Sequence, residues 1–382
     1  MKIEQRLWTK DGGWTCRQPL AAGLSPDLVL VFGATGLLEG DLLREVERQY
    51  PSAYICGCST AGEIADEQVF DDSLTTTALA FKHSEVRAAE TNVRGPADSF
   101  SAAQTLVSAL PADGLVHVFV LSDGLKVNGT ELVRGLTSKL PAGVGLTGGL
   151  SGDGSRFERT LVYCGGSASQ GRIMALGFYG DRLRIGYGSM GGWASFGPER
   201  KVTKSCGNIL YELDDRSALA LYKEYLGEHA AGLPASGLLF PISLRGDEGH
   251  AGVVRTILAV DEKDQSMTFA GDVPEGKYVR LMWANFDRLI DGASGAAKNA
   301  MHRASDPLYK TPDLAILVSC VGRKLVLTQQ IEEEVEAVRH VVGAGATLTG
   351  FYSYGEIGPF SATAKCELHN QTMTVTTLTE AA

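Results

Sequence analysis

Two octets that align without gaps, one near each end of the chain, carry residue types able to do chemistry. Gly-Cys-Ser-Thr-Ala-Gly-Glu-Ile occupies residues 57–64, and Gly-Phe-Tyr-Ser-Tyr-Gly-Glu-Ile occupies residues 350–357. Each follows a strand-like apolar run, and ligands usually bind at strand ends in open α/β sheets. The candidate ligand-binding side chains of the two octets are Ser59, Thr60, Glu63, Ser353, Tyr354 and Glu356. The carboxylates could hold an ammonium group or cap a helix, or they could tie down a neighbouring loop.

A third candidate is the polar, glycine-rich loop Gly-Gly-Leu-Ser-Gly-Asp-Gly at residues 148–154. Its backbone N–H groups could hold an anion, and its candidate side chains are Ser151 and Asp153. It lacks the Lys-Ser/Thr ending of a P-loop, which argues against a nucleoside triphosphate. A ligand loop and a plain connection both remain open.

Catalytic chemistry finds little support in the sequence. Ser59 lies in a turn one residue too long for a Gly-x-Ser-x-Gly elbow, and no histidine or acidic partner can be named. The turn Gly33–Gly36 resembles the phosphate turn of an NAD(P) domain, but its spacing is G-x-x-G-x-x-x-G and no acidic residue ends the second strand. We therefore expect no enzyme, with an NAD(P)-dependent oxidoreductase using this turn as an alternative.

Haem would need an axial ligand, most often histidine. Of the seven histidines, His117 lies inside an apolar strand-like run and His369 lies at a strand start. Each is a candidate axial ligand, and a structural hydrogen bond is the alternative for each. The seven cysteines form no Cys-x-x-Cys pair, which fits a reducing compartment and gives no metal-ligand set.

The elements that position these residues follow the same order in three stretches of the chain. Each has an apolar run of strand length, then an amphipathic helix, then one of the glycine-rich turns, and such apolar runs suit strands buried on both faces. The expected helices lie at about 37–49, 129–139 and 329–342, and further β-rich runs follow at 74–81, 160–164 and 373–378. Residues 225–285 instead show short runs between charged turns, which is a hairpin or meander pattern. The sequence predicts an α/β (α+β) fold of repeated strand–helix–strand units in mixed sheets, with a β-meander in the C-terminal half.

Composition narrows the class of protein. The net charge of −10 and pI of about 5.3 argue against nucleic acid or an anionic membrane surface as a partner. No apolar run reaches the roughly 18 residues of a membrane span, and the first residues lack the apolar segment of a secretory signal. With 382 residues, two domains are the default. We expect a cytoplasmic protein without membrane insertion.

Several blocks together resemble the FIST family. In chain order they are residues 57–64, 148–153, Val202–Ser205, Leu210–Asp214, Ser319–Arg323, 350–357 and Leu368–Thr372. The resemblance covers roughly residues 25–380, and it implies an N-terminal FIST sensory domain over 25–225 and a C-terminal FIST domain over 226–380. It also adds Arg323 to the candidate ligand-binding residues.

The resemblance implies a sensory protein of signal transduction that binds a small ligand. FIST proteins are associated with histidine kinases and cyclic-di-GMP enzymes, so either is an expected partner, and a homo-oligomer stays open. A stand-alone branch binds haem and senses nitric oxide with a partner kinase, and this chain, similar to FIST from end to end, resembles that branch. An amino-acid-binding module, with Glu63 or Glu356 holding the ammonium group, is an alternative.

Overall fold

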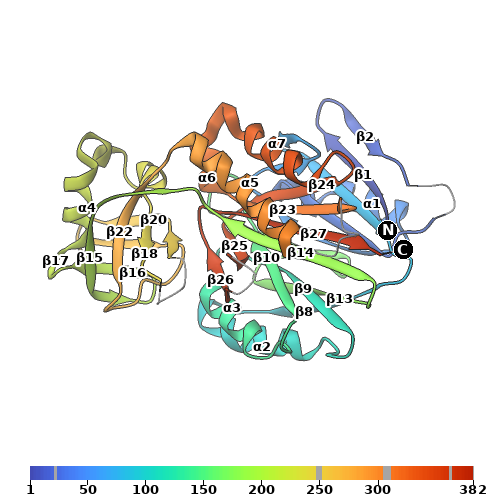
Figure 1. Ribbon diagram of the computed structural model, residues 1–382, viewed down its shortest axis with the longest axis horizontal. Helices are drawn as coiled ribbons and strands as arrows, with labels where there is room; N and C mark the ends of the chain where they lie inside the picture. Colours follow the sequence, from blue (N-terminus) through green and yellow to red (C-terminus); the bar gives the residue numbers. More distant parts are fainter. Residues whose placement is uncertain (21–23, 247–251, 304–310, 361–363, 382) are drawn as a thin grey trace.

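The computed structural model describes residues 1–20, 24–246, 252–303, 311–360 and 364–381. A large body of three sheets lies beside a small β-rich domain (Figure 1). The two chain termini lie together at the end of the body far from the small domain, where the Met1 amino group is 3.5 Å from a Glu380 carboxylate oxygen (Figure 1). Among the described residues, no helix combines the length and apolar character that crossing a membrane requires.

The first sheet has the strand order β12-β11-β4-β3-β7-β1-β2. Its strands are β1 (Lys2–Thr9), β2 (Gly13–Gln18), β3 (Leu28–Gly33), β4 (Tyr54–Ser59), β7 (Leu74–Ala80), β11 (Val162–Cys164) and β12 (Ser167–Ser169). The parallel pair β3 and β4 is joined by the 3-10 helix η1 (Thr35–Glu39) and by α1 (Asp41–Gln49). Every residue of β3 is buried, as its unbroken apolar run predicted.

The second sheet has the order β26-β25-β10-β9-β13-β8. Its strands are β8 (Glu85–Asn92), β9 (Leu115–Ser122), β10 (Gly145–Leu150), β13 (Arg172–Tyr179), β25 (Gly355–Pro359) and β26 (Cys366–His369). η2 (Pro96–Asp98) and α2 (Ser99–Ser108) precede β9, and α3 (Gly129–Thr137) joins the parallel strands β9 and β10. Asn128 caps α3 by accepting the Glu131 N–H at 3.1 Å.

The third sheet has the order β14-β27-β23-β24-β5-β6. Its strands are β5 (Glu63–Ala65), β6 (Gln68–Phe70), β14 (Leu183–Met190), β23 (Leu314–Cys320), β24 (Thr347–Ser353) and β27 (Met373–Glu380). α6 (Val321–Leu327), η5 (Thr328–Gln330) and α7 (Ile331–Val342) join the parallel pair β23 and β24. α5 (Phe286–Arg303) lies across β14 on the same side as α7 (Figure 1).

The inner strands follow the same order in all three sheets, and each sheet receives one hairpin from another unit. In every sheet a hairpin pairs with the second parallel strand, and the first parallel strand pairs with an antiparallel return strand. The hairpin always comes from another unit: β5–β6 follows β4 but joins the third sheet, β11–β12 follows β10 but joins the first, and β25–β26 follows β24 but joins the second. The glycine-rich turns are therefore crossover points between sheets.

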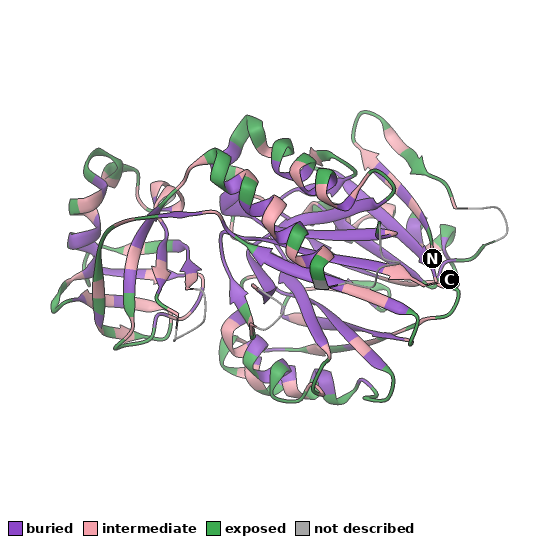
Figure 2. Ribbon diagram, in the orientation of Figure 1, coloured by how far each residue is buried: buried purple, intermediate pink, exposed green. Residues whose placement is uncertain are grey.

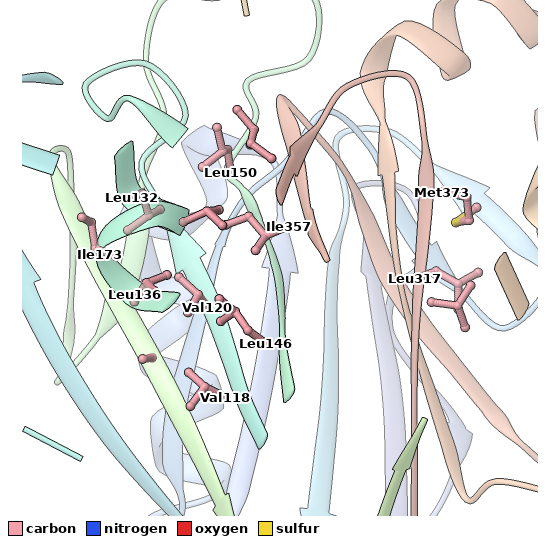
Figure 3. Packing of buried hydrophobic residues seen from close by; sticks show 14 of the residues in the cluster. Val118, Val120, Leu132, Leu136, Leu146, Leu150, Ile173, Leu317, Ile357 and Met373 are labelled. Atoms are coloured by element: carbon pink, nitrogen blue, oxygen red, sulfur yellow. The ribbon is translucent and has the colours of Figure 1, made fainter. Parts of the chain in front are cut away.

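Helices cover the outer faces of the body and the sheets form its interior (Figure 2). Leu132 and Leu136, four residues apart on α3, project onto Val118 and Val120 of β9 and Leu146 of β10 (Figure 3). This spacing places both leucines on one helical face. The predicted strand–helix–strand packing is thus confirmed in the second unit, and mixed α/β architecture holds for the whole body.

The small domain is an antiparallel sheet with its own core, in the order β19-β18-β22-β15-β16-β21-β20 with β17 beside β16. Its strands are β15 (Ala194–Cys206), β16 (Ile209–Leu213), β17 (Arg216–Ser217), β18 (Ile242–Leu244), β19 (Val253–Arg255), β20 (Ile257–Asp261), β21 (Ser266–Phe269) and β22 (Tyr278–Trp283). Its helical segments are α4 (Ala218–Leu226), η3 (Gly227–Gly232) and η4 (Ala235–Leu239). The short strands expected over 225–285 are present as the hairpins β18–β19 and β20–β21 and the strand β22. The expected boundary at 225/226 falls inside this domain, at the end of α4.

Candidate functional site

The three crossover turns meet at one point of the body, which we call the hub (residues 59–63, 150–154 and 352–356). The turns are hydrogen-bonded to one another in a ring. Backbone N–H groups donate from Gly152 to Ser59 O (2.9 Å), from Ala61 to Tyr352 O (2.8 Å) and from Tyr354 to Leu150 O (3.1 Å). The structure therefore brings together most of the residues that the sequence singled out, from both octets and from the central loop.

One glycine opens each crossover for the same steric reason. A Cβ atom at Gly57, Gly148 or Gly350 would lie 1.7, 1.9 or 1.9 Å from a carbonyl oxygen of the neighbouring parallel strand. No side chain fits at that separation. The shared position identifies the central loop as the third copy of the repeated turn, although it lacks the Glu-Ile ending.

Glu63 ties the hairpin strand β5 to the start of the returning strand β7. Its carboxylate accepts hydrogen bonds from the Thr60 hydroxyl, from Ser73 Oγ at 2.6 Å and from the Ser73 N–H at 3.2 Å. Burial raises its pKa to about 7, although these hydrogen bonds act in the opposite direction. Ser59, beside it, donates to Gly152 O at 2.7 Å and accepts the Leu161 N–H.

Glu356 has the same structural role in the third unit, where it ties the hairpin strand β25 to the start of the returning strand β27. It accepts from Ser353 Oγ at 2.6 Å, from Thr372 Oγ1 at 3.0 Å and from the Thr372 N–H at 3.2 Å. Complete burial raises its pKa to about 8 against the effect of these bonds. Neither Glu63 nor Glu356 lines one of the cavities described below, so both carboxylates hold chain segments together in this geometry.

The backbone of the central loop is also engaged. The N–H groups of Ser151, Gly152 and Gly154 donate to Ser122, Ser59 and Thr60 carbonyl oxygens. The Ser151 hydroxyl donates to the Ser122 carbonyl oxygen at 2.9 Å. These groups build the hub and leave no nest of N–H groups for an anion there.

Asp153 of the central loop is buried, and it pairs with the partly exposed side chain of Arg156. It is 3% exposed and accepts from the Thr35 hydroxyl at 2.8 Å, the Arg159 N–H at 3.1 Å and Arg156 Nε at 3.0 Å. Burial raises its pKa, but the bonds from Arg156 and Thr35 outweigh burial and the net pKa is lowered. Asp153 is thus an ionised anchor for Arg156.

Arg323 is a residue of α6, and its side chain lies in a fully buried polar network that reaches Tyr352 of the hub. Its guanidinium donates to Glu334 Oε2 from Nε (2.9 Å) and Nη2 (2.7 Å), and to the carbonyl oxygens of Gly191 and Leu289. Tyr352 donates to the other Glu334 oxygen at 2.8 Å. The network joins β24, α5, α6 and α7 to the linker that enters the small domain.

The turn Gly33–Gly36 does not present a helix N-terminus. It leads into η1, and the regular helix α1 begins only at Asp41, which places a carboxylate in its first turn. A dinucleotide site needs the N–H groups of a helix start beside the glycines. The Thr35 hydroxyl is also taken up by Asp153. This geometry argues against the dinucleotide alternative.

A cleft lies between the body and the small domain. Its main cavity has a volume of about 780 Å³, within the usual range for small-molecule sites. Its lining is largely apolar, with side chains that come from the central loop, α6, η4 and β20 and from the segments beside them: Leu125, Phe157, Leu233, Pro234, Leu238, Leu239, Ile257, Leu258, Leu325 and Val326. Of the described lining residues, Arg156 alone is charged.

A smaller cavity of about 190 Å³ continues the cleft and shares Leu125, Phe157 and Leu258 with it. Its polar lining includes Asn128 at the start of α3 and Asp272 of the small domain, joined by a hydrogen bond of 3.3 Å. The cleft therefore has a long apolar part and a short polar part.

Three leucines of this cleft are unusually exposed. Leu125, Leu258 and Leu325 are 36%, 41% and 39% exposed, and they come from three segments far apart in sequence. Isolated exposed leucines are ordinary, whereas exposed apolar side chains grouped around one cavity are a common feature of binding sites. The apolar surface faces a space that a ligand can fill.

The family follows from comparison with known domains. The family model of the FIST N domain matches residues 27–216, and that of the FIST C domain matches residues 218–359. The chain belongs to the FIST family. FIST domains are small-ligand sensory domains of signalling proteins.

Other comparisons add little to this FIST assignment. No curated protein matches the sequence. A crystal structure of a cyanuric acid hydrolase from A. caulinodans has 12% sequence identity and a TM-score of 0.19, covering 78% of this chain and 100% of that chain. A likeness of that size supports no conclusion about function.

The two candidate haem ligands of this FIST protein are buried in the body. His369 Nε2 lies 2.6 Å from Gly358 O and its ring packs against Phe360; burial lowers its pKa to about 4. His117 Nε2 lies 2.8 Å from Thr147 Oγ1. Neither histidine lines the cleft, and the described residues contain no cluster of metal-ligating side chains. Among the described residues that line the cleft, none is a histidine.

Sequence reasoning found part of this site and missed the rest. Tyr354 was a candidate and lines the smaller cavity, where it stacks on Phe157 with ring centroids 4.3 Å apart. Arg156 and the exposed leucines were not candidates, because single leucines and a loop arginine are common in any sequence. The sequence feature that could have pointed to Arg156 was the candidate Asp153, three residues before it.

Proposed function

We propose that this FIST protein is a cytoplasmic sensor whose small ligand binds in the cleft between the body and the small domain. The observation that carries the proposal is the apolar cavity of about 780 Å³ walled by both units, with three exposed leucines around it. Sites between domains suit sensing, because a ligand that contacts both units favours one arrangement of them by its differential affinity. A histidine kinase or cyclic-di-GMP enzyme would read that arrangement.

The two units are joined by few polar contacts, which suits such a change. The described ones include Asn128 to Asp272, Arg255 Nη1 to Leu368 O at 3.0 Å, and Gln371 to Leu238 O at 3.3 Å. A hydrophobic cluster also joins the units, since Val254 of the small domain packs with Leu289 and Val326 of the body. A ligand shifts the population of arrangements by its differential affinity for them, so its contacts must exceed what this packing contributes.

α6 offers the route from the cleft to the body. Its consecutive residues face three regions: Arg323 enters the buried network, Lys324 Nζ donates to the hub at Ala61 O (2.9 Å), and Leu325 and Val326 line the cleft. A ligand that moves Leu325 moves Lys324 with it. We propose α6 as the element that links ligand binding to the hub.

We propose binding without catalysis. Among the described residues that line the cleft, no nucleophile lies beside a base. The amino-acid alternative would need an ammonium group to reach Glu63 or Glu356, and three hydrogen bonds from hydroxyl and backbone groups engage each of these buried carboxylates.

Haem is a second proposed ligand. Because His369 and His117 lie away from the cleft, haem there would need another ligand atom or a different arrangement of the chain. Haemin titration followed by the Soret band tests this directly. A sharp Soret shift that is lost in His369→Ala would restore His369 as the ligand, and the absence of any shift would remove haem.

The cleft itself is tested with Nile red, a neutral apolar dye that fluoresces on leaving water. We expect one strong site in the native protein, lost in Leu258→Asp and in Leu325→Asp. Leu24→Asp is the matched control, because Leu24 is 46% exposed but lines neither cavity of the cleft. Equal dye binding by all four proteins would refute the cleft as the binding site.

A further inference from the structure

The main cavity of the cleft has a chemical preference that follows from the position of Arg156, the one charged residue among its described lining residues. We infer that it takes a straight-chain amphipathic acid, with the apolar chain along the leucine wall and the carboxylate on Arg156. This rests on the proposed function, since it assumes that the cleft is the ligand site. Three observations about Arg156, the wall and the hub support it.

Arg156 is held in place before any ligand arrives. Its Nε and Nη2 both donate to Oδ1 of the buried Asp153, and no described residue accepts from its Nη1, which lies by Gly154. The side chain is 52% exposed and lies between two cavities, the cleft and a second cavity of about 460 Å³ whose lining includes Asp153. A guanidinium fixed on one edge keeps donors for a carboxylate on the other.

The loop that bears Arg156 is itself rigid. The next residue, Phe157, stacks on Tyr354, and its N–H donates to the Tyr354 hydroxyl at 3.2 Å. That hydroxyl donates in turn to Gly154 O at 3.1 Å. Little conformational freedom is lost when a ligand binds such a loop, so the arginine is preorganised.

The remaining surface selects against other ligand classes. The walls on both sides are apolar, so the body of the ligand must be apolar, and affinity should rise with its length. Asp153 offsets part of the charge of Arg156, and hub N–H groups are already bonded, so a dianionic phosphate would find too few donors. A single carboxylate matches a single guanidinium.

Displacement of Nile red by dodecanoate, dodecan-1-ol and dodecyltrimethylammonium, each below its micelle concentration, tests this inference on the full chain. Dodecanoate should displace the dye at the lowest concentration and the cationic analogue at the highest. From octanoate to dodecanoate, affinity should rise by up to about fourfold per methylene group. Arg156→Gln should weaken dodecanoate by about tenfold and leave dodecan-1-ol unchanged.

The control variant is Arg44→Gln, because Arg44 also pairs with an acidic residue three positions away but lines no part of the cleft. Arg156→Lys should recover part of the lost affinity. If Nile red binds and needs Leu258, but the acid and the alcohol displace it equally, the cleft stands and the carboxylate assignment is overturned. If Nile red does not bind at all, the proposed function fails with it.

Discussion

The hub and the cleft differ in what their residues do. The polar hub residues Glu63, Ser151 and Glu356 are buried and hydrogen-bonded to neighbouring chain segments. Cleft residues such as Leu258 and Leu325 are apolar and partly exposed. The sequence predicted that polar residues at strand ends bind the ligand. In the structure these polar residues hold neighbouring chain segments together, and the proposed ligand site is instead lined by partly exposed apolar side chains.

The largest expected effect on stability comes from removing a buried charge from the body. Arg323→Ala would leave Glu334 buried without its partner, and we expect a loss of about 3–5 kcal/mol in the free energy of unfolding. Urea unfolding followed by circular dichroism measures it. Arg44→Ala, at a side chain 72% exposed, should change stability by less than about 0.5 kcal/mol. Equal losses in the two variants would show that Arg323 contributes no more to stability than an exposed arginine does.

The buried glutamates predict a pH dependence of stability. The folded-state pKa of Glu356 is raised from 4.5 to about 8, so between these values the folded protein holds a proton that the unfolded chain has released. Its contribution is therefore complete below about pH 4.5 and is lost as pH rises to about 8, by about 1.4 kcal/mol per pH unit.

The measurement is chemical denaturation of the native protein and of Glu356→Gln between pH 5 and pH 8. Glutamine stays neutral, so the stability difference between the two proteins should shrink or reverse as the pH rises. Glu63→Gln should act likewise up to about pH 7. Parallel pH profiles for variant and native protein would contradict the buried, protonated state.

Asn128 lies where the two regions meet, since it caps α3 and bonds to Asp272. Asn128→Ala should cost about 1 kcal/mol through loss of the cap. Asn128→Ser should restore the cap within a few tenths of a kcal/mol but not the bond to the small domain. Comparing their Nile red affinities separates helix stability from domain contact: if only stability matters, the serine variant binds as the native protein does.

The smallest expected effect on stability is in the cleft. Leu258→Asp and Leu325→Asp replace side chains that are 41% and 39% exposed, so we expect stability changes within about 0.5 kcal/mol. Their loss of Nile red binding should be nearly complete. A large fall in melting temperature would instead assign these leucines to structural packing and remove the contrast with the hub.

The repeated strand–helix–strand units, their buried strands, the cap at Asn128 and the short strands of the small domain were predictable from sequence. Each depends on local pattern: apolar runs, helical spacing or a capping side chain. The polar residues of the octets were recognised as well, with their structural use among the alternatives. Their proximity to one another could not be predicted, because the hairpin after each turn joins another sheet.

The sequence by itself determined the elements, the acidic balance and membership of the FIST family, since these depend on residue order and composition alone. Tertiary structure alone decided that Glu63 and Glu356 accept hydrogen bonds from neighbouring chain segments, and that three distant leucines surround one cavity. The physical reason is that burial and exposure are set by contacts between segments far apart in the chain, which local patterns do not encode.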